Sequence, residues 1–347
     1  MREALHAIIV CCVAFSMQGC LAIMDKDPQH IKALKALGGK LDRDADGHVV
    51  SLTLNAIENE SIDNNAAKHI AKLPHLRQLR LFAPRVTESA LAHLQGLSEL
   101  KSLDVQILHL SGAGARSIAA LPKLNSLSLS DTTITDDAIS HLSSLGNLRC
   151  LALEYCDVDN SDLRQLCNLG QLQMFWVCEA DVSDDALTGL HKLRALEHLH
   201  LSSIEITDES LKHVGKLTGL KKLSIQYTGI TDGGLRHLAG LTELQDLDLG
   251  SNEIDGSGLI HLSRLKDLKA IGLYDTYFAG EPVRHLSQFP KLEKLWVYNT
   301  PLSDDDVKAI GSLQSLRFLS LHGTEVSQNG LTALRGRLSK CEIVPND

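Results

Sequence analysis

Aromatic side chains are scarce in this sequence, and Phe, Trp and Tyr together make up 4% of its 347 residues. With only two Trp and five Tyr, the positions of these rings are informative. Basic residues are also in the minority, with 34 Lys and Arg against 43 Asp and Glu and a formal net charge of −9. No block of Lys and Arg is present, so nucleic acid is not an expected partner. The 44% hydrophobic and 22% charged residues are typical of a folded chain.

Paired cysteines are missing as well. Three of the eight Cys lie within residues 1–20. The other five are odd in number and have no paired spacing, so they do not predict a disulfide framework. We interpret them as small apolar side chains: Cys150, Cys156, Cys167, Cys178 and Cys341.

A run of apolar residues long enough to span a bilayer is also not found near the start. Residues 7–17 are eleven apolar or small residues, whereas a spanning helix needs about 20. With Gln18-Gly19-Cys20 after it, this stretch resembles a bacterial lipoprotein signal. The resemblance implies cleavage before Cys20, lipidation of Cys20, and an exported protein anchored to the cell envelope without spanning the membrane. An ordinary cleaved signal and a retained segment are the alternatives.

From Leu73 onward the sequence repeats every 24 residues without an insertion. In one unit the hydrophobic pattern is Leu220-x-x-Leu223-x-Ile225-x-x-Thr228-x-Ile230. It matches the leucine-rich repeat pattern, with Thr where Asn or Cys usually stands. The eleven units begin at Leu73, Leu97, Leu121, Leu145, Leu169, Leu193, Leu217, Leu241, Leu265, Phe289 and Leu313.

These repeats predict an α/β fold, a curved leucine-rich repeat solenoid with a parallel sheet on the concave face and short helices on the convex face. We expect an N-terminal cap and irregular first repeat over 21–72, with a helix near Pro28–Gly38. The eleven repeats occupy 73–336 and a C-terminal cap 337–347. The units resemble planctomycete-type bacterial leucine-rich repeat proteins and the arrays of F-box and GALA proteins. An F-box takes about 40 residues ahead of the repeats, and we do not recognise one in 21–72, so a ubiquitin-ligase receptor is a remote alternative.

The residue after the corner hydrophobe is Thr, Ser or Asp in ten of the eleven units and can accept a hydrogen bond from the open amides of a helix start. Acidic runs such as Asp136-Asp137 and Asp304-Asp305-Asp306 often follow. We interpret them as residues that oppose the helix dipole rather than as catalytic carboxylates.

Three motifs suggest chemistry. Asp42-Arg-Asp44-Ala-Asp46-Gly47 copies half of an EF-hand loop, but Thr53 stands where such a loop needs Glu, so we favour a hairpin turn over a calcium site. Ser111-Gly112-Ala-Gly114 lacks the rest of a phosphate-binding loop. A column of histidines precedes the helix leucines, and we expect it to be too widely spaced for one zinc ion: His69, His93, His141, His213, His237, His261 and His285. We therefore expect no metal and no cofactor.

Both Trp and four of the five Tyr fall on or beside the outward strand positions. The core does not require aromatic rings there, and exposed Trp and Tyr are typical of binding hot spots. The alternative is that the rings only pack on one another along the sheet. The predicted partner-binding residues are Tyr155, Trp176, His198, His200, Tyr274, Trp296, Tyr298, Phe318 and His322.

These residues favour a non-catalytic scaffold that binds a protein partner on its concave face. A carbohydrate-binding or cell-wall-binding surface protein that uses the same rings is the second hypothesis. The third is an enzyme that uses Glu154 or Glu179 with His198 and His200, for which an open sheet offers no predicted pocket.

Overall fold

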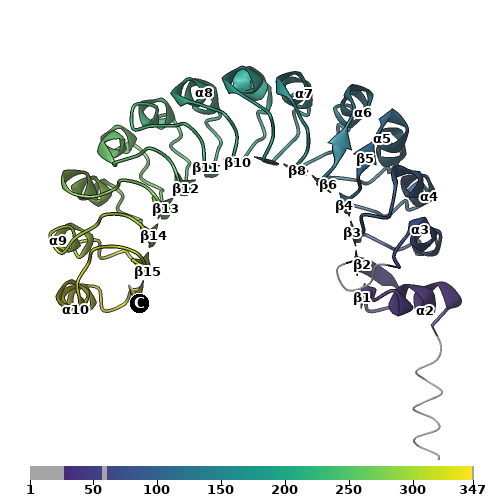
Figure 1. Cartoon of the computed structure of the whole chain (residues 1–347), viewed down its shortest axis with the longest axis horizontal. Coiled ribbons are helices and arrows are strands. Elements are labelled where there is room, and N and C mark those ends of the chain that lie inside the picture. The colour runs from purple at the N-terminus through teal and green to yellow at the C-terminus, as the bar shows by residue number, and fades with distance from the viewer. Residues whose placement is uncertain (1–26, 57–60, 346–347) are drawn as a thin grey trace, which may run out of the picture.

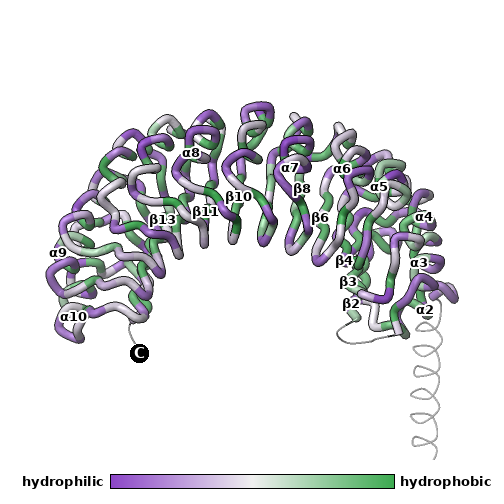
Figure 2. The backbone as a smooth tube through the Cα atoms, turned by 45° about the horizontal axis from the view of Figure 1, so that its top comes forward, coloured by the Kyte–Doolittle hydropathy of each residue, from purple (hydrophilic) through white to green (hydrophobic). Residues whose placement is uncertain are grey.

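The computed structural model describes residues 27–56 and 61–345 as one arch of stacked repeats (Figure 1). Strands line its concave face and helices its convex face. The predicted signal and Cys20 lie outside the described residues. Hydrophobic segments recur in every repeat along the arch (Figure 2). The predicted solenoid fold is thereby confirmed.

The concave face is one fourteen-stranded sheet in the described part of the chain. It is parallel except for the antiparallel pair formed by its first two strands. Its strands are β1 (Lys40–Arg43), β2 (Val49–Asn55), β3 (Gln78–Phe82), β4 (Ser102–Gln106), β6 (Ser126–Ser130), β8 (Cys150–Glu154), β9 (Met174–Cys178), β10 (His198–Ser202), β11 (Lys222–Gln226), β12 (Asp246–Asp248), β13 (Ala270–Gly272), β14 (Lys294–Trp296), β15 (Phe318–Ser320) and β16 (Glu342–Val344). A separate two-stranded sheet, which the sequence pattern did not predict, joins β5 (His109–Leu110) to β7 (Thr133–Ile134).

The convex face combines α-helices with 3₁₀-helices. The α-helices are α2 (Gln29–Ala36), α3 (Asn64–Ile70), α4 (Leu91–Leu94), α5 (Gly112–Ala119), α6 (Asp136–Leu142), α7 (Asn160–Leu166), α8 (Asp208–Val214), α9 (Val307–Ile310) and α10 (Gln328–Arg337). The 3₁₀-helices are η1 (Glu88–Ala90), η2 (Asp184–Lys192), η3 (Leu235–Leu238), η4 (Ser257–Leu262) and η5 (Glu281–Gln288). None of the described helices is long and apolar enough to cross a membrane.

Alternation along each strand separates the core from the concave surface. In β11, Leu223 and Ile225 are buried while Ser224 between them is only partly covered. Fully burying one such side chain stabilises the fold by about 1.5–3 kcal/mol. From β3 to β16, paired residues of neighbouring strands are 24 positions apart, as in Leu199 and Leu223. The same position of each repeat therefore forms a straight column across the sheet.

Side-chain hydrogen bonds from one position of the repeat close the turns beneath the sheet in the last four repeats. Thr276, Thr300 and Thr324 are buried, and each hydroxyl donates to the backbone carbonyl three residues earlier. Asn252 occupies the equivalent position and donates to the carbonyl of Ile225 in the preceding repeat. Thr therefore serves at this position, as the repeat pattern predicts, because its hydroxyl satisfies a buried carbonyl.

Side chains at the helix starts also join one repeat to the next. Asp208 accepts hydrogen bonds from the backbone amide and the hydroxyl of Thr231, both at 2.8 Å. Pairs of this kind, each 23 residues apart, are Asn64–Thr87, Glu88–Ser111, Asn160–Ser183, Asp184–Thr207, Asp208–Thr231, Asp232–Asp255 and Asp304–Ser327. We call this set the helix-start ladder. Interpreting the acidic residues only as partners of the helix dipole was therefore incomplete.

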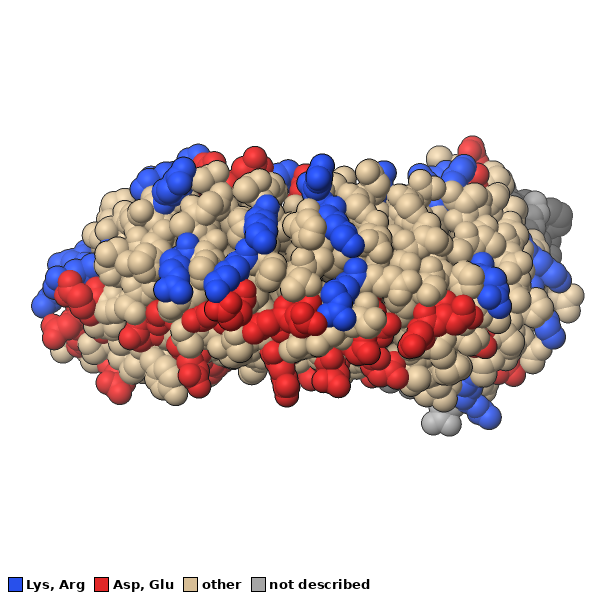
Figure 3. Space-filling view, turned by 90° about the horizontal axis from the view of Figure 1, so that it is seen from above, with Lys and Arg blue, Asp and Glu red and all other residues tan. Residues whose placement is uncertain are grey.

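Acidic and basic side chains occupy different parts of the convex surface. Acidic side chains gather along one edge of the convex face and Lys and Arg lie toward the other (Figure 3). The helices explain this separation, because α8 has Asp208 and Glu209 in its first turn and Lys212 and His213 in its last. Each placement complements the helix dipole.

Candidate binding site on the concave face

The predicted concave residues form two groups of stacked rings. In the first, Trp176 of β9 stacks on His200 of β10, with ring centroids 3.8 Å apart and an interplanar angle of 22°. The Trp176 indole also donates a hydrogen bond to the Cys178 sulfur at 2.8 Å. Burial lowers the pKa of His200 to about 4, so this imidazole is neutral at neutral pH. Trp176 nevertheless keeps 39% of its surface exposed.

The second group lies toward the C-terminal end of the sheet. Tyr274 and Tyr298 stack almost in parallel, with centroids 4.6 Å apart and an angle of 8°. Trp296 packs against Phe318 in a tilted arrangement with centroids 5.7 Å apart. The rings therefore do pack on one another along the sheet, as the alternative interpretation proposed. Trp296, Tyr298 and Phe318 nonetheless remain only partly buried.

Two hollows open beside these rings. The first, of about 390 Å³, is lined by Trp176, His198 and His200 together with Met174, Lys222 and Asp246. The second, of about 380 Å³, is lined by Asp246, Asp248, Gly272, Tyr274, Trp296 and Tyr298. The expectation that the open sheet carries no pocket was therefore wrong.

Other predicted residues stand apart from the hollows. Neither Tyr155 nor His322 lines them, and both are exposed. Tyr155 lies in a turn with a positive φ of 54°. Glu154 and Glu179, the carboxylates of the enzyme hypothesis, line neither hollow, so the structure does not gather them with His198 and His200.

Two carboxylates that were not predicted from the sequence lie between the two groups of rings. Asp246 and Asp248 line both hollows. Burial raises the pKa of each, and for Asp246 the charges of Lys222 and Lys294 act in the opposite direction. The available signal for Asp248 was an acidic residue next to Gly272 and two positions from Trp296 in the same outward column.

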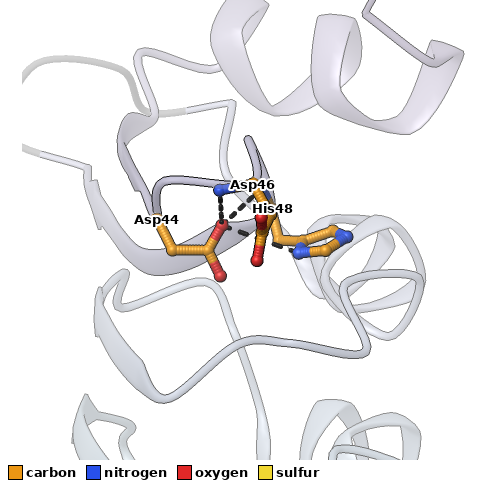
Figure 4. A group of neighbouring side chains, drawn as sticks. All are labelled: Asp44, Asp46 and His48. Carbon is orange, nitrogen blue, oxygen red and sulfur yellow. Dashed lines mark hydrogen bonds and ion pairs between the residues drawn. The ribbon is translucent and has the colours of Figure 1, made fainter.

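The EF-hand-like segment forms the predicted hairpin. β1 pairs antiparallel with β2, and Thr53 pairs with Lys40 inside the sheet. Ligand atoms of Asp44, Asp46 and His48 lie within 4.8 Å of one another (Figure 4). The Asp44 carboxylate accepts hydrogen bonds from the backbone amides of Asp46 and His48 at 3.1 and 2.9 Å. The turn itself therefore accounts for this cluster.

The remaining motifs are structural. Across residues 27–56 and 61–345, the hairpin cluster is the only group of three or more acidic, Cys or His residues within ligand distance, so the histidine column does not converge. Gly112 begins α5, and a Cβ there would lie 1.7 Å from the Asp137 carboxylate of the next repeat. Close packing between helices accounts for that glycine.

Comparison with known proteins supports the architecture. Residues 132–300 match the family model for a leucine-rich repeat region. Among solved structures, the chain is similar to an internalin, InlF, from Listeria monocytogenes, with a TM-score of 0.61, 22% identity, and coverage of 87% of this chain and 90% of that chain. No curated protein matches the chain.

Two further structures are similar at lower scores. One is a leucine-rich repeat protein from Leptospira interrogans, with a TM-score of 0.42, 18% identity, and coverage of 84% of this chain and 94% of that chain. The other is the plant peptide hormone receptor RGFR1 in complex with RGF2, with a TM-score of 0.49, 15% identity, and coverage of 80% and 56%. The stacked repeats, the match over residues 132–300 and the fold shared with the internalin identify this chain as a protein of the leucine-rich repeat fold.

Proposed function

We propose that the chain is a non-catalytic scaffold that binds a partner protein on its concave face. The observation that carries the proposal is the row of partly exposed rings and hollows on β9–β15, at positions that point away from the core. Leucine-rich repeat proteins act generally as interaction scaffolds, and solenoids present extended concave binding surfaces. Trp and Tyr are enriched among residues that dominate binding energy.

The test is the capture of partner proteins from a cell-envelope extract of the organism that produces this protein. The bait is the full chain with Cys20→Ser, compared with the same chain carrying Trp176→Ala and Trp296→Ala. We expect each truncation to weaken binding of a captured protein by about 2 kcal/mol or more, measured by titration with the purified partner. Tyr277→Ala is the matched control, because Tyr277 is a 70% exposed ring that lines neither concave hollow.

Retention of the partner by the double variant would place binding on another face. Competition by soluble cell-wall glycans, with no protein captured, would favour the carbohydrate hypothesis, for which the parallel Tyr274–Tyr298 pair supplies a flat stacking surface.

We also propose that the chain is exported and anchored at the cell envelope through a lipid on Cys20. The support is the signal-like sequence of residues 1–20. Metabolic labelling with radioactive palmitate tests it. Cys20→Ser should abolish the label and release the chain from the membrane fraction, whereas Cys12→Ser should leave both unchanged. Label that persists in Cys20→Ser would contradict the anchor.

A further inference from the structure

The hollow beside Trp296 depends on two glycines at outward positions. Asp248, Gly272 and Trp296 occupy the same position in β12, β13 and β14 and are paired in register. Because Gly272 has no side chain, the Asp248 carboxylate leans over it. A Cβ at Gly272 would lie 2.5 Å from Asp248 Oδ1. A Cβ at Gly250 would likewise lie 2.3 Å from Cζ of Tyr274, so Gly250 makes room for that ring to reach Asp248.

The negative charge of Asp248 has no partner of opposite sign. Its carboxylate accepts hydrogen bonds from the Gly250 amide at 3.1 Å, the Gln226 side-chain amide at 2.8 Å and the Tyr274 hydroxyl at 3.3 Å, and all three donors are neutral. No ion pair involves Asp248 in the described part of the chain. A carboxylate has about four acceptor positions, so one position remains available.

Two other acidic groups on the concave face differ in this respect. Asp104 occupies the same column, and the Arg80 guanidinium lies 3.8 Å from its carboxylate. The positive charges of Lys222 and Lys294 favour the ionised form of Asp246 and lower its pKa against the effect of burial. Of the two carboxylates that line the hollows, only Asp248 therefore lacks a nearby positive charge.

Aromatic rings complete the walls of the hollow. Trp296, whose ring packs against Phe318 of β15, lines the hollow together with Tyr274 and Tyr298. The faces of Trp and Tyr attract cations. An arginine guanidinium is planar, stacks on aromatic faces and can donate a hydrogen bond to the acceptor position that remains on the carboxylate, whereas a lysine ammonium is a compact, strongly hydrated point charge.

We propose that the hollow over Gly272 receives an arginine side chain of the partner protein. The guanidinium pairs with the Asp248 carboxylate and packs against the rings of Trp296 and Tyr274. This inference rests on the proposed function, since it names the chemistry by which the concave face recognises its partner.

The test uses the full chain with Cys20→Ser and Trp176→Phe, so that Trp296 is the only tryptophan. N-acetyl-arginine amide is the probe and N-acetyl-citrulline amide is its neutral, nearly isosteric control. We expect the arginine probe to change the Trp296 fluorescence saturably at millimolar concentration, with the citrulline probe at least tenfold weaker. Asp248→Asn should weaken arginine binding at least tenfold. Asp104→Asn, which alters the matched carboxylate in the same column, should leave arginine binding unchanged.

If the chain with an intact hollow binds the arginine and citrulline probes equally well, the inference is overturned. This comparison does not depend on the folding of any Asp248 variant. Arginine binding by Asp248→Asn as tight as by the parent would also overturn it. If Asp248→Asn still captures the partner while the tryptophan variants lose it, the scaffold function stands and the arginine site fails. If the probe binds but the tryptophan variants retain the partner, the hollow stands and the proposed function fails.

Discussion

At the scale of single residues, the turns after the strands show the strongest constraint. Eight non-glycine residues have φ between 48° and 56° at the same position of successive repeats: Asp131, Tyr155, Glu179, Ser203, Tyr227, Ser251, Asp275 and Asn299. Gly323 occupies this position in the following repeat with a φ of 70°. This left-handed conformation costs a residue with a Cβ about 1–2 kcal/mol. The repeat geometry therefore imposes a conformation that most of these side chains disfavour.

Glu179→Gly should raise the free energy of unfolding by about 0.5–1 kcal/mol, since glycine adopts a positive φ without strain. Urea denaturation checks the change. The matched control is Glu154→Gly, because Glu154 ends strand β8 in an extended conformation where glycine only loosens the chain. A loss of stability in both variants would contradict the interpretation.

Asp184 makes stability depend on pH. Burial alone would raise the pKa of this carboxyl, but hydrogen bonds from the Ser210 hydroxyl and from the amide and hydroxyl of Thr207 outweigh it and lower the pKa below its ordinary value of 3.8. A group with a lowered folded-state pKa contributes stability above its unfolded pKa and loses it as pH falls through the folded pKa.

Asp184→Asn should therefore show a shallower loss of stability than the unmutated chain between about pH 5 and pH 2. Asparagine keeps an acceptor oxygen, and Asn64 and Asn160 already occupy equivalent ladder positions. Unfolding free energies at a series of pH values check the expectation. Parallel curves for the two chains would show that Asp184 does not titrate with folding.

At the scale of elements, the helix-start ladder separates two roles of acidic residues in the first turn of α8. Asp208 binds Thr231 of the next repeat, whereas Glu209 pairs with Lys212 on its own helix. Both face the same helix dipole. Only Asp208 joins two repeats.

Asp208→Ala should lower the free energy of unfolding by at least about 1 kcal/mol, because it leaves the Thr231 amide without its charged acceptor. Glu209→Ala should cost about 0.3–0.5 kcal/mol, as expected of an exposed pair near a helix start. Thermal or urea denaturation of both variants makes the comparison. Similar losses would assign both residues to the helix dipole alone.

The fold was predictable from the sequence because every repeat has hydrophobic residues at the same positions. Leu and Ile spaced as in Leu223 and Ile225 bury one side of each strand, and the repetition leaves a single way to stack them. The choice between α- and 3₁₀-helix was not predictable, since a single turn such as that of η3 differs from α4 only by fine hydrogen-bond geometry. The helix-start ladder was not predictable either. An acidic residue at a helix start gives the same sequence pattern whether its carboxylate stabilises its own helix or accepts hydrogen bonds from the next repeat.

The candidate site was predictable only in part for a similar reason. The repeat pattern placed Trp176, Trp296 and Tyr274 on the outward columns, and the structure places them there. How an outward side chain leans is decided by its neighbours in other repeats. Asp248 reaches over Gly272 because that neighbour lacks a Cβ, and no local pattern encodes such a relation.

At the scale of the whole molecule, each repeat contacts mainly its neighbours, so stability is close to a sum of repeat and interface terms. The free cysteines lie in different repeats along the arch. Cys156 and Cys167 are buried in central repeats, and burial raises the pKa of their thiols to about 11 and about 12. Cys341 is half-buried beside the last strand, β16.

Thiol labelling should therefore begin at Cys341 and reach Cys156 and Cys167 only at higher urea, because a terminal repeat is supported on one side alone. Alkylation followed by peptide mass analysis measures the order. Variants that keep one of the three cysteines, with the others changed to Ala, provide the controls. Simultaneous labelling of all three positions would indicate a single cooperative unit.

The constant offset of 24 residues between paired strands from β3 to β16 has a kinetic consequence. Parallel sheets usually fold slowly, since their strands meet only after long loops have closed. Here each pairing closes a loop of about one fourteenth of the chain, which is a relative contact order in the range of helical bundles. We expect the arch to assemble by local zipping from a nucleus of a few repeats, at a rate that barely changes when further repeats are added to the array.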